Sequence, residues 1–376
     1  MNSLSAVKAA ADPTSERQPR LDGKILIIGG YGQVGQMIAV RLAALFPGRV
    51  VVAGRSLAKA RAAAAGIGHG VEARALDIFA VDNAAALDGV ALVLVCLDQT
   101  DRRFAAQCLA RGLRYLDISA DYGFLSQVEE LDACARQTGA TALLSVGVAP
   151  GLTNLLAARA CATMAGVARL DILLEIGLGD HHGQAAIEWL FDNLDVVYQV
   201  REAGRLKSVR SFGDSLDLAL PGAKTARPAY RFNFSDQQVI GRTLDVPTVS
   251  TWIRFEDRLP TWIFAKAAQG GLGRLLRRRW WRKLAVWLFM NVHMGSDRCG
   301  VAVRATASAA AGGKELLLGV VGRKEALMTA IVAAETARQA LLGDLPAGVV
   351  HSEQAIDLEA VIQALDKELP DLAVTL

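Results

Sequence analysis

The chain has 376 residues, of which 52% are apolar, and a formal net charge of +3 at pH 7. This length exceeds one average domain and predicts two, with enough apolar residues for a substantial core. The nearly balanced charge gives no support for nucleic-acid binding. Five cysteines without a CxxC pair predict buried thiols of a reducing compartment, so we expect a cytoplasmic protein without disulfides or zinc.

The N-terminal segment is polar and alanine-rich, which predicts a flexible tail over 1–22 that lacks a secretory signal. The first structured element follows at 24–36 and reads Lys-Ile-Leu-Ile-Ile-Gly-Gly-Tyr-Gly-Gln-Val-Gly-Gln. An apolar run that suits a buried strand precedes Gly30-x-Gly32-x-x-Gly35, and a helical pattern continues to about residue 46. Strand, glycine turn and helix in this order are the context of the dinucleotide fingerprint.

Each glycine of this fingerprint has a physical task. Gly30 permits the tight turn, Gly32 lets the backbone approach a pyrophosphate, and Gly35 lets the helix pack close to the strand. The N–H groups at the helix start would face the anion. The residues expected to contact the cofactor here are Gly29, Gly30, Tyr31, Gly32, Gln33, Val34 and Gly35.

A second strand at 49–53 ends in Gly54-Arg55-Ser56. An NAD site usually places an acidic residue here to bind the ribose 2′-hydroxyl. A guanidinium and a hydroxyl suit a 2′-phosphate instead, so the sequence favours NADP(H). The alternative is that Arg55 is a solvated loop arginine.

Short apolar strands then alternate with helical stretches up to about residue 147. Further strands are expected at 71–76, 91–97, 115–119 and 142–146, with helices at 57–65, 82–87, 102–111 and 124–138. This rhythm predicts a doubly wound parallel sheet, whose ligands gather at the carboxyl ends of the strands. The cofactor contacts expected at those ends are Asp77, Ile78, Leu97, Asp98 and Ser119.

The pattern changes after Gly151. A helix is expected over 152–164, and 170–176 alternates apolar residues with Asp171 and Glu175, which predicts an antiparallel strand covered on one face. Later predictions are hairpins at 196–209 and 300–321, a strand at 248–255 and a helix at 323–342. We expect a dinucleotide domain over 23–150, a second α+β domain with an antiparallel sheet over 151–322, and C-terminal helices over 323–376 that return to the first domain.

The segment 273–294 combines six basic residues with three tryptophans. A basic, tryptophan-bearing amphipathic helix can lie on an anionic membrane. The commoner alternative is a surface helix whose apolar face packs on the core or on a subunit partner. No apolar run approaches the roughly 20 residues needed to span a bilayer.

Four segments in this order resemble the saccharopine dehydrogenase (reductase) family, which includes carboxynorspermidine dehydrogenase. They are Gly-Gly-Tyr-Gly-Gln-Val-Gly at 29–35, Ala-Gly-Arg-Ser at 53–56, Tyr-Leu-Asp-Ile-Ser at 115–119 and Gly-Val-Ala-Pro-Gly-Leu-Thr-Asn at 147–154. The resemblance implies a Rossmann domain and an NADP-dependent oxidoreductase that reduces an imine to a secondary amine, or the reverse, on an amino-acid-derived substrate. It also implies a homodimer formed through the second domain.

Such chemistry needs a proton donor near the substrate nitrogen. The candidates are Asp117, Tyr122 and His182, with a loop-capping carboxylate and an exposed imidazole as the alternatives for Asp117 and His182. The residues expected to bind a substrate carboxylate are Pro150, Gly151, Thr153 and Asn154, with helix capping by Thr153 as the alternative. The sequence has no HxxxH or HExxH spacing, so no metal site is expected.

Two other functions are alternatives to this one. A short-chain reductase needs Tyr-x-x-x-Lys, and none of the five tyrosines has a lysine four positions later. A non-catalytic NADPH-binding sensor or scaffold stays open, because the loop at 96–100 lacks the small residues expected beside a nicotinamide.

Overall fold

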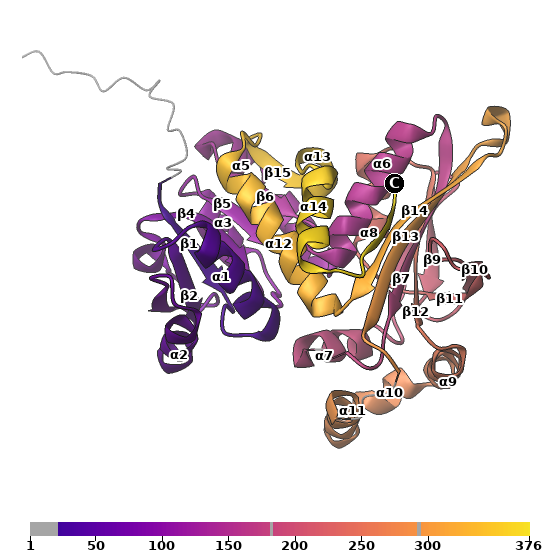
Figure 1. Ribbon diagram of the computed structural model, residues 1–376, viewed down its shortest axis with the longest axis horizontal. Coiled ribbons are helices and arrows are strands. Elements are labelled where there is room, and N and C mark those ends of the chain that lie inside the picture. Colours follow the sequence, from indigo (N-terminus) through magenta and orange to yellow (C-terminus); the bar gives the residue numbers. More distant parts are fainter. Residues whose placement is uncertain (1–21, 181–182, 292–294) are drawn as a thin grey trace, which may run out of the picture.

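The computed structural model describes residues 22–180, 183–291 and 295–376. Most of the expected tail at 1–22 therefore lies outside the described residues. Strands within these ranges form two seven-stranded sheets and a separate two-stranded hairpin. Figure 1 shows the first sheet at the left and the second at the right.

The first sheet is parallel, with strand order β15-β6-β5-β4-β1-β2-β3. Its strands are β1 (Lys24–Ile28), β2 (Val50–Gly54), β3 (Glu72–Ala75), β4 (Val90–Val95), β5 (Arg114–Asp117), β6 (Thr141–Leu144) and β15 (Gly348–His351). Ile25 and Ile27 enter one core cluster while Leu26 and Ile28 enter another, so both faces of β1 are buried. The predicted doubly wound sheet is confirmed, and β15 adds an edge strand that the sequence did not indicate.

Helices cover this sheet on both faces. They include α1 (Gln33–Leu45), α2 (Leu57–Ile67), α3 (Arg103–Leu109), α4 (Tyr122–Glu129) and α5 (Asp132–Thr138), with a short 3₁₀ turn, η1 (Ala84–Leu87). The single helix predicted over 124–138 is two helices. The first begins earlier because the Asp121 carboxylate accepts a hydrogen bond from the Gly123 N–H at 2.7 Å and caps it.

The second sheet has strand order β10-β11-β12-β7-β13-β14-β16. Its strands are β7 (Val167–Ile176), β10 (Ser215–Leu218), β11 (Arg227–Arg231), β12 (Thr248–Phe255), β13 (Arg298–Ala307), β14 (Glu315–Arg323) and β16 (Ala373–Thr375), and the hairpin is β8 (Val197–Glu202) with β9 (Arg205–Arg210). All pairings are antiparallel except that of β7 with β12. A second α+β domain is confirmed. Its helices are α6 (Thr153–Thr163), α7 (Gln184–Asp192), α8 (Asp236–Thr243), α9 (Arg258–Gln269), α10 (Leu272–Leu276) and α11 (Arg279–Asn291).

The central strand β7 differs from its prediction. Asp171 and Glu175 are each only 1% exposed, so the strand is covered on both faces. Glu175 accepts hydrogen bonds from Arg227 at 2.5 Å and Arg254 at 2.7 Å. Buried charges are tolerated where they are paired in this way, so the polar half of the alternation marked an internal ion-pair layer instead of a solvated face.

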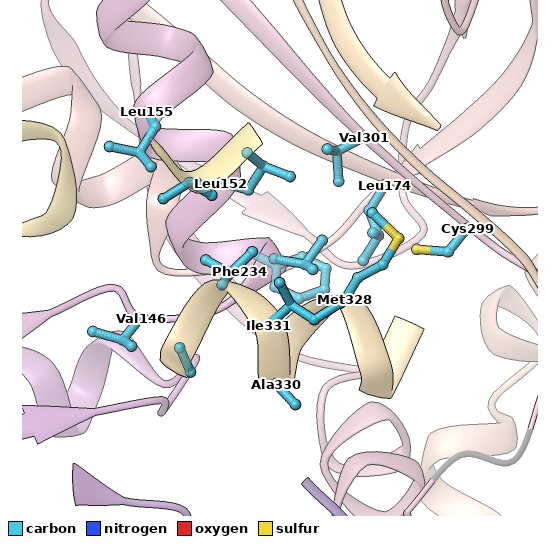
Figure 2. Packing of buried hydrophobic residues seen from close by; sticks show 14 of the residues in the cluster. Val146, Leu152, Leu155, Leu174, Phe234, Cys299, Val301, Met328, Ala330 and Ile331 are labelled. Carbon is cyan, nitrogen blue, oxygen red and sulfur yellow. The ribbon is translucent and has the colours of Figure 1, made fainter. Parts of the chain in front are cut away.

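The long helix α12 (Glu325–Leu342) joins the two domains. It packs against α1 on one side, and its Met328 and Ile331 lie in the same cluster as Leu174 and Val301 of the second sheet. Figure 2 shows these side chains gathered around the helix. One continuous core therefore connects both sheets and fixes the carboxyl ends of the first sheet relative to the second domain.

Candidate functional site

The glycine loop between β1 and α1 has the tight geometry that a dinucleotide needs. A methyl group on Gly35 would lie 2.4 Å from the carbonyl oxygen of Gly29, so only glycine lets the helix approach the strand this closely. Gly29 itself has φ +75°, in the left-handed region that favours glycine. Helix α1 begins after Gly32 with no acidic residue in its first turn, so its positive end is available to an anion.

The loops after β1 and β4 meet at the carboxyl edge of the sheet, where the strand order reverses. A methyl group on Gly29 would come within 2.9 Å of the Cys96 carbonyl oxygen and of the Leu97 side chain. Leu97 is 41% exposed there. This is the topological switch point at which open α/β sheets bind their ligands.

A cavity of about 500 Å³ opens at the ends of β2 and β3, lined by residues that include Arg55, Asp77 and Asn83. Within the described ranges the exposed Arg55 guanidinium makes no hydrogen bond or ion pair, so it is free to bind a ligand. The Ser56 hydroxyl accepts from the Lys59 N–H at 3.3 Å and can still donate. Tyr31 reaches from the glycine loop to this end, and its hydroxyl accepts from the Ser56 N–H at 3.5 Å.

The sequence reasoning missed Asn83, which lines the same cavity. Its side chain is 6% exposed, and its Nδ2 has no hydrogen-bond partner among the described residues. The Asn83 backbone N–H donates to Gln107 at 3.0 Å, which fixes its position. A buried donor without a partner is costly, and a ligand acceptor in the cavity would satisfy it. Arg55 and Asn83 are thus candidate donors to a ligand in a cavity that the carboxylates of Asp77 and Asp82 also line.

Asp117, at the end of β5, is fully buried. Its carboxyl group accepts hydrogen bonds from the Tyr115 hydroxyl at 2.5 Å, the Gln99 amide at 2.5 Å and the Ser119 N–H at 2.7 Å. Burial raises its pKa to about 7, although the hydrogen bonds work in the opposite direction. These contacts favour the loop-capping alternative over direct contact with a substrate, because both carboxyl oxygens are already engaged.

The raised pKa of Asp117 gives a test of this role. A folded-state pKa above the ordinary value of 3.8 means that the protonated form stabilises the fold. That stabilisation is present below about pH 4 and is lost as the pH rises through about 7. The Asp117→Asn variant should therefore lose less thermal stability than the wild type between pH 5 and 8. It should also retain NADPH binding. If the stabilities of the wild type and of Asp117→Asn changed in parallel with pH, the raised pKa of Asp117 would be contradicted.

Helix α7 of the second domain lies against the strand ends. A methyl group on Gly183, just before α7, would come within 3.2 Å of the Gln33 side-chain oxygen in the glycine loop. The pKa of Asp98 is raised by loss of hydration and by the neighbouring carboxylates of Asp121, Glu188 and Asp192. Glu188 and Asp192 belong to α7, so acidic groups of both domains converge beside the loop after β4.

Of the two other catalytic candidates, Tyr122 and His182, the structure describes only Tyr122. Tyr122 is the first residue of α4 and is half-buried, and burial and Glu129 raise its pKa while Arg242 lowers it. Its ring therefore lies toward the ion pair between Glu129 and Arg242, whose side-chain atoms are 2.6 Å apart. His182 lies outside the described residues. The structure thus places Asp117 and Tyr122 at the two ends of the one loop that joins β5 to α4, without a hydrogen bond between them within the described ranges.

The turn at 147–154 is buried. Pro150, Gly151, Thr153 and Asn154 all lack appreciable exposure. Asn154 accepts from the Gly151 N–H at 3.0 Å and donates to Glu353 at 2.9 Å, so its amide is already satisfied. Thr153 does not cap the helix either, since no side chain caps the start of α6. A role in holding α6 against the C-terminal segment explains these contacts better than substrate binding does.

Residues 25–143 match the family model of the saccharopine dehydrogenase NADP binding domain. The first domain belongs to this family. Apo saccharopine dehydrogenase (L-Glu forming) from Saccharomyces cerevisiae superimposes with a TM-score of 0.63 at 14% identity, over 94% of this chain and 100% of that chain. DAP dehydrogenase of C. glutamicum, in complex with DAP, gives 0.45 at 16% identity, over 92% and 99% of the two chains. No curated protein sequence matches the chain.

The saccharopine dehydrogenase-type domain confirms the expected family resemblance and the cofactor NADP(H). The likeness to the yeast structure extends over both domains and shows that the chain shares the fold of that structure. The individual cofactor contacts stay predictions, and two of them have unexpected surroundings. Ile78 is buried in the core of the sheet, and Ser119 is 6% exposed beside Asp117.

Of the three residues that the sequence did not indicate for the site, Asn83, Glu188 and Asp192, only Asn83 had a signal in the sequence. Asn83 begins the short turn predicted after the third strand, and a polar residue at a strand's carboxyl end is a candidate ligand group. Glu188 and Asp192 lie far from the fingerprint in sequence, and only the docking of α7 brings them to it.

Proposed function

We propose that this protein is an NADP(H)-dependent oxidoreductase acting on the C–N bond of an amino-acid-derived substrate. In this reaction an imine carbon gains a hydride and the nitrogen gains a proton, which gives a secondary amine; the reverse reaction returns both. The bound cofactor supplies the hydride chemistry. The glycine loop would hold the pyrophosphate, and Arg55, Ser56 and Asn83 would hold the 2′-phosphate.

The observation that carries the substrate class is the convergence of carboxylates beside the switch point. Asp98 has no hydrogen-bond partner within the described ranges, while Asp192 is paired with Arg282 at 2.5 and 2.8 Å. Like charges at close range destabilise one another, and a cationic amine beside Asp98 would relieve its repulsion from Asp121 and Glu188. An amine-bearing substrate therefore suits this edge better than a neutral alcohol.

We assign the proton donor to a residue near the carboxyl ends of the first sheet. Tyr122 is the described candidate, because its hydroxyl makes no hydrogen bond within the described residues and its ring borders the second domain. His182 remains a second candidate. Asp117 is better assigned to fixing the turn that carries Ser119.

The function is tested by NADPH oxidation, followed at 340 nm, with a panel of amines paired with 2-oxo acids. Asp98→Asn should raise the KM for the amine about tenfold or more, since a hydrogen bond to a charged group contributes about 1.5–3 kcal/mol. Its thermal stability should not fall, because the raised pKa of Asp98 shows that the ionised form is disfavoured in the fold. Asp88→Asn, at the amino end of β4, is the matched control and should leave the KM unchanged.

Tight NADPH binding without oxidation by any pair would favour the non-catalytic sensor or scaffold instead. The homodimer implied by the family resemblance is a separate proposal. Light scattering of the purified protein tests it, and a monomeric mass at micromolar concentration would contradict it.

A further inference from the structure

Helices α9, α10 and α11 form a helical layer, residues 258–291, that projects from the second domain at the lower edge of Figure 1. This layer holds eight basic residues and no acidic one. No helix in the part of the chain that the structure describes is long and apolar enough to cross a membrane. The layer is therefore a strongly basic surface feature.

The same layer exposes an unusual amount of apolar surface. Of the nineteen exposed large hydrophobic side chains among the described residues, nine lie here: Leu259, Trp262, Ile263, Leu275, Trp280, Leu284, Trp287, Leu288 and Met290. Trp262, Trp280 and Trp287 are 54%, 58% and 57% exposed. An exposed apolar patch of this kind marks a surface that binds another molecule or a membrane.

The spacing of these residues places them on outward faces. Trp280, Leu284 and Trp287 follow one side of α11, at intervals of four and three residues. The inner side is already packed, since Phe289 contacts Phe191 of α7 with ring centroids 5.4 Å apart and Phe264 of α9 at 6.1 Å. The inner side of the layer is therefore packed. Within the described residues Trp280, Leu284 and Trp287 stay exposed, with Trp280 stacked on the neighbouring Trp281 at a ring-centroid distance of 3.8 Å.

Basic side chains flank this stripe. Arg277, Arg278, Arg279 and Lys283 are exposed and make no ion pair within the described ranges. Arg282, on the inner side, is instead bound to Asp192 of α7. Cations beside exposed tryptophans match the interface of an anionic bilayer, where the indoles enter the headgroup boundary and the cations meet lipid phosphates.

We propose that the helical layer docks the protein on an anionic lipid surface, lying in the interface without spanning it. A second copy of the chain fits less well, because a two-fold contact would bring these unpaired cations together. Nucleic acid fits less well, because the leucine, isoleucine and methionine side chains have no counterpart on a phosphate backbone. This proposal stands independently of the reaction proposed above.

The test is flotation of the full chain with vesicles of phosphatidylcholine alone or with 30% phosphatidylglycerol. We expect flotation with the anionic vesicles and little with the neutral ones. Arg277→Glu/Arg278→Glu should weaken the partitioning about thirtyfold or more, since each cation near such a surface contributes about 1 kcal/mol. Trp280→Ala/Trp287→Ala should weaken it as well. NADPH affinity should be unchanged in both variants, which shows that they are folded.

Matched controls lie on the β8–β9 hairpin, where Arg205 and Leu206 are exposed and Leu206 is 75% exposed. Arg205→Glu and Leu206→Ala should float like the wild type. Absence of wild-type flotation with anionic vesicles, or equal flotation of the charge-reversed variant, would overturn the proposal. A dimer that the double tryptophan variant converts to a monomer by light scattering would overturn it in favour of a self-interface.

Discussion

Replacing Arg55 by alanine is expected to weaken NADPH binding about ten- to a hundredfold and to leave NADH binding nearly unchanged. The guanidinium lines the cavity at the ends of β2 and β3 and has no partner within the described residues. A charge-assisted hydrogen bond to phosphate contributes about 1.5–3 kcal/mol, which converts to this range of affinity. NADH lacks the 2′-phosphate, so its affinity should not fall when the charge of Arg55 is removed. Calorimetric titration with both cofactors gives the two affinities.

The matched control is Arg61→Ala, which removes the same charge from an exposed position on α2 outside the lining of the cavity. Its NADPH affinity should stay within about twofold of the wild type. Equal losses of NADPH and NADH affinity in Arg55→Ala would show that the guanidinium supports the loop and does not read the 2′-phosphate.

Gly35→Ala is expected to lower the affinity for NADPH and NADH together by at least about tenfold and to destabilise the first domain. The added methyl group would lie 2.4 Å from the Gly29 carbonyl oxygen and 2.9 Å from the Gly30 Cα, so the backbone of the loop must move. Overpacking of this kind costs about 1–3 kcal/mol. The displaced loop no longer presents its N–H groups to the pyrophosphate. Thermal unfolding and calorimetry measure the two effects.

Gly66→Ala provides the comparison, because Gly66 lies in α2 with open space where the methyl group would be. Alanine in a helix interior is favoured over glycine by about 0.5–1 kcal/mol, so this variant should be as stable as the wild type or more stable. Unchanged cofactor binding by Gly35→Ala would mean that the glycine loop does not approach the cofactor in the way the fingerprint predicts.

The first domain could be predicted from sequence because its signals are local. Buried parallel strands read as continuous apolar runs, and the glycine turn after β1 follows directly from the spacing of three residues. Strand β15 was not predicted, because its four residues become a strand only by pairing with β6, more than 200 positions away. The alternation in β7 suggested a solvated face, but Arg227 of β11 and Arg254 of β12 pair with Glu175. Arg304 of β13 pairs with Asp171, and the Trp252 indole of β12 donates a hydrogen bond to it.

The candidate site was predictable only in part, for the same reason. The fingerprint predicted the tight glycine loop between β1 and α1, and the residues after β2 indicated NADP(H). The surroundings of Asp117 depend on Gln99, from the loop after β4, and those of Asn154 depend on Glu353. No pattern within a single segment carries such information, so the sequence could not show that Asp117 and Asn154 are held by these partners.

The most direct test of the central claim follows deuterium from the C4 position of labelled NADPH into product, with mass spectrometry locating the label. The proposed function predicts deuterium on the carbon bonded to nitrogen in a secondary amine formed from an amine and a 2-oxo acid. Deuterium on the hydroxyl-bearing carbon of a 2-hydroxy acid, with no amine product, would contradict C–N chemistry. Failure to transfer the label from tightly bound NADPH to any substrate pair would contradict catalysis itself.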